Sequence, residues 1–207
     1  MKKIKVRITF TEEILGTCSG DPKLHEEFVA SKAPNAQSME EEVAALGVDE
    51  VVRNGMTVFP RDDQGRPFLW DYQIKGFFKD ACSMLARCGG KDSSGKKAEV
   101  NESSKIKAYK KIIDGLIFVN PRRIPFIFDG QVGSCQRPLR AQTAQGERIA
   151  IANSETVPAG AYIDAEIVLL NSEYEAAVIE WLDYGALRGI GCWRNASKGR
   201  FEYQILD

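Results

Sequence analysis

The chain has 207 residues, of which 43% are hydrophobic and 28% are charged. This composition is that of an ordinary soluble globular protein and is sufficient for one substantial core. No apolar run reaches the ~20 residues that span a bilayer, and the first residues lack the apolar stretch of a signal peptide, so we expect a cytoplasmic protein.

Five cysteines and one histidine limit the chemistry of the side chains. The cysteines are odd in number and form no Cys-x-x-Cys pair, whereas disulfide scaffolds and structural zinc sites need paired spacings. We therefore expect free thiols and no resident cofactor. His25 is the only histidine, which excludes mechanisms that need two histidines.

Charge is distributed unevenly along the chain, although the net charge is −1. Residues 73–148 hold 15 Lys and Arg against 7 Asp and Glu, and residues 149–207 hold 4 against 9. A cationic segment in an otherwise acidic protein indicates a polyanion site. A solvated lysine-rich linker around residues 91–111 accounts for part of this excess.

The first predicted element is a strand over residues 2–10, where apolar and polar side chains alternate strictly. Turn residues follow at 15–22. Residues 22–31 and 38–46 predict two short helices, the second with Ser38 as its N-cap and Glu41 at the capping-box position. We assign them to an acidic helical insertion, residues 22–50.

The middle of the chain predicts two short strands, 56–60 and 68–70, before a long helix. In residues 72–87 apolar side chains recur at helical spacing and leave Lys75, Lys79 and Arg87 on the flank. Residues 88–104 are polar, rich in Gly, Ser and Lys, and predict a flexible linker.

The remaining elements are predominantly strands. We expect strands at 112–119, 123–128, 139–143, 147–153 and 162–170, then a helix from 172 or 173 to 187 and a terminal strand. We expect residues 130–153 to form a basic, thumb-like hairpin. The order of elements predicts an α+β sandwich of the ferredoxin-like or RNA-recognition type, in a single domain over residues 1–207. Many functions share that fold.

A glycine-rich basic loop precedes the terminal strand. Glycine permits positive φ and close approach of a ligand, and guanidinium groups are suited to phosphate. The candidate nucleic-acid-binding residues of this loop are Arg188, Gly189, Gly191, Trp193, Arg194, Lys198, Gly199 and Arg200. A helix C-cap followed by a hairpin turn would explain one or two of the glycines without any ligand.

Other segments add candidate nucleic-acid contacts. Lys75 and Lys79 lie four residues apart on one helix face, with Gly76 between them. Arg137 and Arg140 belong to the basic hairpin. Candidate platforms for base stacking are Trp70, Tyr72 and Trp193. Core packing is the alternative for each aromatic residue, and helical spacing favours it for Phe77, Phe78 and Trp181.

Four segments in order resemble the RAMP (repeat-associated mysterious protein) superfamily of CRISPR effector subunits. Residues 61–79 are similar to its acidic turn, Gly-x-Pro and Lys-Gly block, and residues 154–168 to its Val-Pro-x-Gly strand entry. Residues 14–21 resemble the glycine-containing stretch after its first strand, and the C-terminal loop resembles its glycine-rich motif. The resemblance is greatest to the subunits that bind the CRISPR guide RNA as the backbone of the complex.

This resemblance implies a RAMP fold, a ferredoxin-like core with inserted helices and a hairpin thumb. It also implies nucleic-acid contacts at Gly16 and Gly20, a guide RNA as ligand, and head-to-tail self-association or binding to other effector subunits. The setting would be a prokaryotic cell or a phage-infected host. The chain departs from the family at residues 70–73, where the pattern prefers Pro-Gly-Ser-Ser, and it lacks the histidine of repeat-cleaving members unless His25 replaces it.

Asp21 is the one candidate catalytic residue. Some backbone subunits of the family carry an acidic residue at this place for cleavage of target RNA, which would make the chain a metal-dependent endoribonuclease with a divalent metal as its only cofactor. Asp21 precedes Pro22 and also fits a helix N-cap, so we favour a protein without catalysis.

Three functions stay open. The first is an RNA-binding RAMP-like protein that grips a single-stranded backbone within a CRISPR-type ribonucleoprotein. The second is a stand-alone RAMP-derived protein, for example of a bacteriophage, that interferes with or mimics an effector complex or coats nucleic acid. The third is a structural interaction domain without RNA binding.

Overall fold

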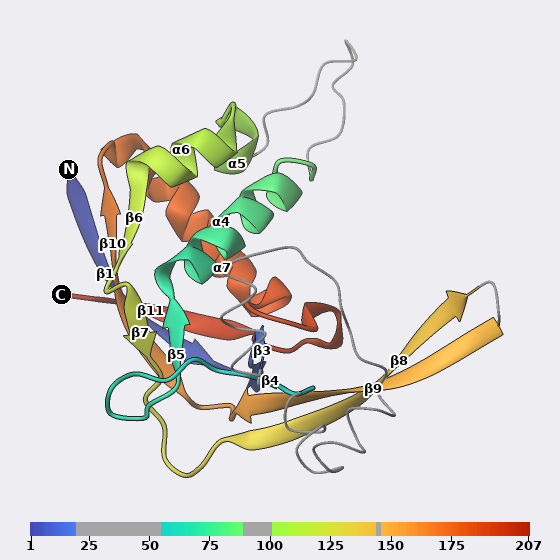
Figure 1. Ribbon diagram of the computed structural model, residues 1–207. Coiled ribbons are helices and arrows are strands. Elements are labelled where there is room, and N and C mark those ends of the chain that lie inside the picture. Colours follow the sequence, from blue (N-terminus) through green and yellow to red (C-terminus); the bar gives the residue numbers. More distant parts are fainter. Residues whose placement is uncertain (20–54, 89–100, 144–145) are drawn as a thin grey trace. The chain divides into compact units, whose positions relative to one another are not determined.

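The computed structural model describes residues 1–19, 55–88, 101–143 and 146–207, with backbone only at 139–143 and 147–150 (Figure 1). The expected helices at 22–31 and 38–46, together with Gly20, Asp21, His25 and most of the expected linker, lie outside these residues. The chain divides into two compact units. The first comprises Met1–Ile14, Arg61–Gly130 and Pro158–Asp207, and the second Leu15–Pro60 and Gln131–Val157.

The first unit contains a four-stranded antiparallel sheet. Its order is β11 (Phe201–Leu206), β1 (Lys2–Phe10), β10 (Tyr162–Leu169) and β6 (Ile117–Asn120). The alternation in β1 buries Ile4, Val6, Ile8 and Phe10 on one face, as the sequence predicts. A short pair, β5 (Phe68–Trp70) with β7 (Arg123–Pro125), completes the strands of this unit within the described residues.

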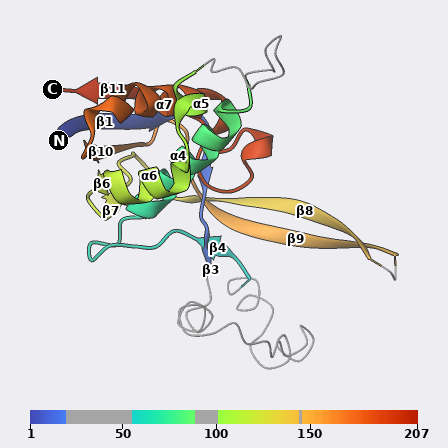
Figure 2. The ribbon, with the colours of Figure 1, turned by 90° about the horizontal axis from the view of Figure 1, so that it is seen from above.

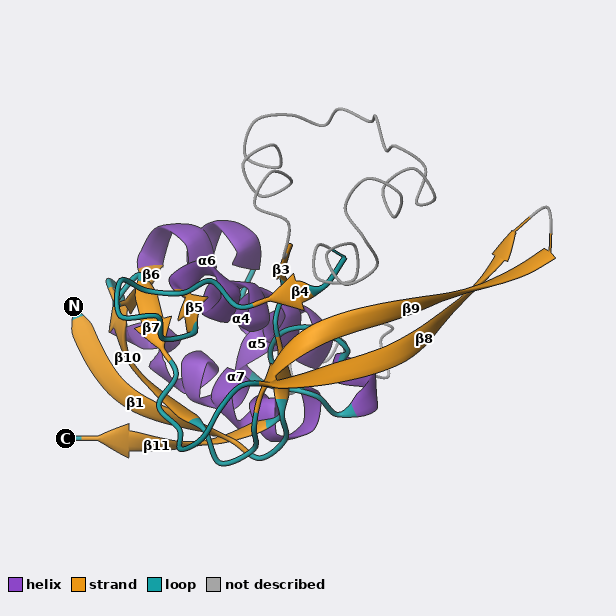
Figure 3. Ribbon diagram, turned by 60° about the horizontal axis from the view of Figure 1, so that its bottom comes forward, coloured by secondary structure: helices purple, strands orange, loops and turns teal. Residues whose placement is uncertain are grey.

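Helices cover the buried face of this sheet (Figure 3). They are α4 (Asp71–Leu85), α5 (Glu102–Lys105), α6 (Tyr109–Leu116) and α7 (Glu175–Arg188), the last preceded by a 3-10 turn, η1 (Ser172–Tyr174). Phe77, Phe78 and Trp181 are buried between sheet and helices, which confirms that helical spacing marked them for the core. No helix in the described part of the chain is long and apolar enough to cross a bilayer.

The second unit is a β-structure around a long hairpin. Strands β8 (Gly133–Thr143) and β9 (Gly146–Val157) run side by side as a two-stranded ribbon (Figure 2). Three short strands belong to the same sheet, β2 (Ile14–Leu15), β3 (Cys18–Ser19) and β4 (Thr57–Val58). The buried Glu155 of β9 accepts a hydrogen bond from the backbone N–H of Phe59 at 2.9 Å, which fixes the chain after β4.

The expected α+β class is confirmed, but one predicted strand is wrong. Residues 112–119 form the end of helix α6 and then strand β6. Ile113 and Ile117 are buried four residues apart, the spacing of one helical face, and only from Ile117 does burial alternate. A short apolar run cannot by itself distinguish a helix from a strand. The expected strand at 123–128 is likewise confined to Arg123–Pro125.

Glycine packs helix α7 against strand β11. A Cβ at Gly185 would overlap the ring of Phe201, whereas one at Gly115 in α6 would meet nothing within 4 Å. We predict that Gly185→Ala lowers the free energy of unfolding by about 1–3 kcal/mol through overpacking. The matched Gly115→Ala should be neutral or stabilising by up to about 1 kcal/mol, because alanine favours a helix. Denaturant titration measures both, and equal effects would contradict the packing explanation.

A buried polar group ties α5 to its neighbours. The Ser103 hydroxyl donates to Glu180 Oε2 at 2.5 Å and accepts from Trp181 Nε1 at 2.9 Å. The fully buried thiol of Cys82 donates to the Ser103 carbonyl at 3.9 Å. Burial raises the pKa of Cys82 to about 11.

We predict that iodoacetamide at pH 8 modifies the exposed Cys88 and leaves Cys82 unmodified in the native protein. Only the thiolate reacts, and a thiol with a pKa near 11 is ionised to about one part in a thousand at that pH. Peptide mass spectrometry reads both sites. Cys82 should become reactive once guanidinium chloride unfolds the chain, and equal native rates would contradict the burial.

Candidate nucleic-acid interface

The C-terminal loop, residues 189–200, owes its path to residues with positive φ. These are Gly189 (76°), Gly191 (91°), Trp193 (56°), Ser197 (67°) and Gly199 (70°). The two ends of the loop meet where the Ile190 N–H donates to the Gly199 carbonyl at 2.9 Å. A Cβ at Gly189 would lie 2.6 Å from the Lys198 carbonyl oxygen, and one at Gly199 would overlap the Ile190 carbonyl. Gly189 and Gly199 therefore allow the loop to close on itself.

The closed loop is anchored to the residues that follow β1. The Gly199 N–H donates to the Glu13 carbonyl, and the Thr11 N–H donates to the Arg200 carbonyl, both at 2.9 Å. Lys198 Nζ pairs with Glu13 Oε1 at 2.5 Å, so its charge is neutralised by this anchor. Arg200 is half-buried, and its Nε has no hydrogen-bond partner within the described residues.

Asp80 of helix α4 holds both arginines of the loop region. Its Oδ2 accepts from Arg188 Nε at 3.0 Å and from Arg194 Nη1 at 2.7 Å. Arg188 Nη1 also donates to Asn195 Oδ1 at 3.1 Å. The three charged side chains are 22–27% exposed, and two guanidinium groups face one carboxylate. This Asp80 cluster (Asp80, Arg188, Arg194) therefore carries one excess positive charge at a partly exposed position.

Lys75 and Lys79 both lie near the carboxylate of Asp114 in helix α6. Lys79 Nζ pairs with Asp114 Oδ1 at 2.6 Å, and Lys75 Nζ donates to the Asp114 carbonyl at 3.1 Å. Lys75 also lies over the ring of Phe118, 5.1 Å from its centroid. Lys75 and the two arginines, all candidate nucleic-acid contacts in the sequence, do not form one cationic group. The structure shows two clusters on helix α4, one at Asp80 and one at Asp114.

Gly76 lies one helical turn before Asp80. A Cβ at Gly76 would meet nothing within 4 Å, so this glycine faces open space rather than the core. The surface beside the Asp80 cluster is therefore accessible to a ligand backbone. Trp193 of the loop is 40% exposed.

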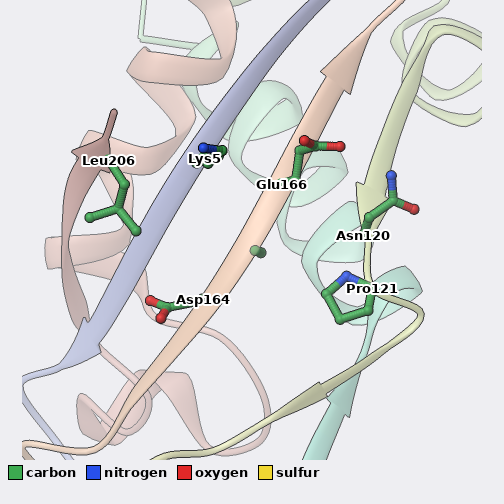
Figure 4. A pocket seen from close by; sticks show the side chains of 7 residues that line it. Lys5, Asn120, Pro121, Asp164, Glu166 and Leu206 are labelled. Carbon is green, nitrogen blue, oxygen red and sulfur yellow. The ribbon is translucent and has the colours of Figure 1, made fainter.

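The open face of the four-stranded sheet is balanced in charge. Arg7 forms two hydrogen bonds with Asp164, at 2.8 and 2.7 Å, and Lys3 pairs with Glu166 at 3.0 Å. A hollow of about 290 Å³ on this face is lined by Lys5, Asn120, Pro121, Asp164, Ala165, Glu166 and Leu206 (Figure 4). Asp164 and Glu166 of the hollow are the carboxylates that pair with Arg7 and Lys3, so the hollow has little net charge to attract a polyanion.

In the second unit, Gly16 has a packing role. Its N–H donates to the Glu155 carbonyl at 2.8 Å, and a Cβ there would lie 2.5 Å from the Val58 carbonyl carbon. Arg137 is half-buried on β8 opposite Ala152, whereas the Arg140 side chain lies outside the described residues. No group of three or more His, Cys, Asp or Glu gathers as a metal site in the part of the chain that is described.

The sequence reasoning missed Asp80, Arg122 and Arg123. Asp80 was predictable, since it lies four residues after Gly76 on the same helix face. The guanidinium carbons of Arg122 and Arg123 lie 5.7 and 5.9 Å from the centre of the Trp70 ring. That contact depends on the pairing of β5 with β7, which no local pattern reveals.

No protein-family model and no curated protein matches the sequence. Among solved structures, all of this chain matches 61% of a chain in the cryo-EM structure of the Type III-B Cmr-beta complex bound to cognate target RNA, with a TM-score of 0.50 and 12% identity. The chain thus spans about three-fifths of that neighbour.

Two further structures are similar. A chain of a Type IV-B CRISPR complex has 11% identity and a TM-score of 0.46, with 99% of this chain and 90% of that chain covered. Cmr6 from Pyrococcus furiosus has 12% identity and a TM-score of 0.49, with 98% of each covered. At these identities the likeness concerns the fold alone, and it agrees with the α+β fold class that the sequence predicts.

Neutralising Asp80 should leave Arg188 and Arg194 facing each other without a counterion. We predict that Asp80→Asn lowers the free energy of unfolding by about 1–2 kcal/mol, between the values of exposed and buried ion pairs. The matched Asp114→Asn should cost less than about 1 kcal/mol, because that side chain is 55% exposed. Thermal and denaturant unfolding compare the two, and an equal or larger cost for Asp114→Asn would contradict the shared role of Asp80.

Proposed function

We propose that the chain binds the sugar-phosphate backbone of single-stranded RNA, as a RAMP-like subunit of a CRISPR-type ribonucleoprotein. The Asp80 cluster is the observation that carries this proposal, because it holds two guanidinium groups in place and leaves a positive charge at the surface. The likeness in fold between this chain and 61% of a chain of the Cmr-beta complex bound to cognate target RNA supports it.

The donors of the Asp80 cluster are suited to phosphate. A guanidinium group has five N–H donors, of which Arg188 uses two and Arg194 one in the hydrogen bonds described above. The others can form bidentate bonds to a phosphate, with the arginines already ordered by Asp80.

Helix α4 extends this surface. Lys75 and Lys79 outnumber Asp114, so the second cluster also carries one excess positive charge. Residues 76 and 80 lie on the helix ridge adjacent to that of residues 75 and 79. A strand that follows the helix could therefore place successive phosphates at the two clusters, and the open space at Gly76 lets its backbone pass closely.

The same proposal includes partners beyond the RNA. The basic hairpin with Arg137 and Arg140 would add contacts to the strand in the manner of a thumb. Head-to-tail self-association, or association with other effector subunits, would repeat these contacts along a guide RNA. Phosphate contacts carry no base information, so we expect no sequence preference from them.

Two variants of opposite charge test the Asp80 cluster. The double variant Arg188→Ala with Arg194→Ala should weaken binding of a single-stranded RNA decamer roughly three- to tenfold, since phosphate contacts are lost. Asp80→Asn should strengthen binding by a similar factor. Fluorescence anisotropy over a salt series measures both, and each lost phosphate contact should reduce the salt slope by about 0.7.

The control removes two positive charges elsewhere in the same unit. Lys2 and Lys105 are exposed and pair with Glu175 and Glu102. The double variant Lys2→Ala with Lys105→Ala should leave the affinity for RNA within twofold of the wild type. Salt screens the attraction between the RNA and exposed charges that lie far from it. Weak binding that is independent of salt, or a loss of affinity in both double variants alike, would contradict the proposal.

A further inference from the structure

Three aromatic rings and two arginines form a cluster at the start of helix α4. Phe68 and Trp70 meet edge to face at 4.9 Å, and Trp70 and Tyr72 stack with centroids 6.0 Å apart and an interplanar angle of 16°. Strand β7 places Arg123 opposite Trp70. The guanidinium groups of Arg122 and Arg123 lie over the Trp70 ring.

Backbone hydrogen bonds hold this cluster in place. The Asp71 N–H donates to the Arg122 carbonyl at 3.0 Å, and the Trp70 N–H donates to Gln73 Oε1 at 2.9 Å. Tyr72 is nevertheless 57% exposed, although it stacks on Trp70. Tyr72 thus presents part of its aromatic surface to solvent from a fixed backbone.

The charge of this cluster is positive. Arg123 Nη1 has Asp63 as its ion-pair partner at 3.6 Å, and the Asp63 side chain is 99% exposed, so solvent screens the pair. Arg122 has no ion pair within the described residues. A solvent-exposed aromatic ring next to cationic side chains is the combination that single-stranded nucleic acids require.

We infer that Trp70 and Tyr72 form a platform on which one base of a single-stranded RNA stacks, with Arg122 and Arg123 binding the adjoining phosphate. The inference rests on the proposed RNA binding and adds a second kind of contact to it. The Asp80 cluster attracts the backbone, whereas this platform takes the base. Stacking is tolerant of base identity because every base has an aromatic face.

The platform is tested with two probes, a labelled uridine decamer and an abasic ribose-phosphate strand of equal length. Tyr72→Ala should weaken binding of the uridine decamer at least about fivefold and leave the abasic strand unaffected, because stacking needs a base. Tyr72→Phe keeps the ring and should bind as the wild type does. Arg122→Ala should weaken both probes, and Arg87→Ala, which removes an exposed arginine beyond the end of α4, should weaken neither.

Other outcomes of this experiment distinguish failure of the stacking platform from failure of the proposed RNA binding. If Tyr72→Ala binds both probes as the wild type does while the Arg188 and Arg194 double variant is impaired, the platform is overturned and the proposed function stands. That result would leave a protein partner as the occupant of the cluster. If Tyr72→Ala weakens both probes equally, its role is not stacking and the inference is wrong. If the wild-type chain binds neither probe, both proposals are overturned.

A second readout does not depend on affinity. Ultraviolet irradiation with 4-thiouridine RNA should cross-link the tryptic peptide of residues 62–75, since trypsin does not cut between Arg66 and Pro67. Tyr72→Ala should remove or strongly reduce this cross-link while the melting temperature stays unchanged. A cross-link that persists at wild-type yield would overturn the stacking geometry.

Discussion

The register of strand β1 determines how the first unit is built. β1 lies between β10 and β11. Phe10, the last residue of β1, pairs with Phe201, the first residue of β11, so β11 starts at the end of the sheet where β1 stops. Helix α7 packs on Phe201 through Gly185, so the chain must reverse tightly between Arg188 and Phe201. The positive-φ residues of the C-terminal loop make that reversal, and the anchor at Glu13 returns it to the end of β1.

The position of the arginines follows from this reversal. Arg188 is the last residue of α7, and Arg194 begins the 3-10 turn η2 (Arg194–Ala196) inside the loop. Because the loop doubles back, side chains six residues apart reach the same oxygen of Asp80. One carboxylate between two guanidinium groups fixes their geometry without cancelling their charge. Asp80 therefore stabilises the loop at some cost to anion attraction, since an asparagine at 80 would repel a ligand less but would hold the loop less firmly.

Sequence patterns predicted the elements with clear periodicity and missed those set by long-range pairing. The spacing of Ile74, Phe77, Phe78 and Ala81 predicted α4 and its buried face, and the strict alternation of β1 predicted its bounds. Residues 112–116 were assigned to a strand because a short apolar run fits the periodicity of a helix as well as that of a strand. The glycines illustrate a different limit. The sequence shows where the backbone needs freedom, but only the structure shows that Gly16, Gly185, Gly189 and Gly199 contact the protein itself and Gly76 does not.

Charge counts had a similar limit. The excess of 15 basic over 7 acidic residues at 73–148 describes the segment, but Asp80 and Asp114 belong to that segment and pair with the very side chains expected to bind phosphate. Among the side chains argued to contact RNA, what remains is two clusters of one excess charge each, together with Arg122 and Arg123. A modest and divided charge favours a ligand that contacts several points in succession, because each point alone is weak at physiological ionic strength. A flexible single strand meets that condition, since its phosphates and bases can reach separate points one after another, whereas a compact anion can occupy only one of them.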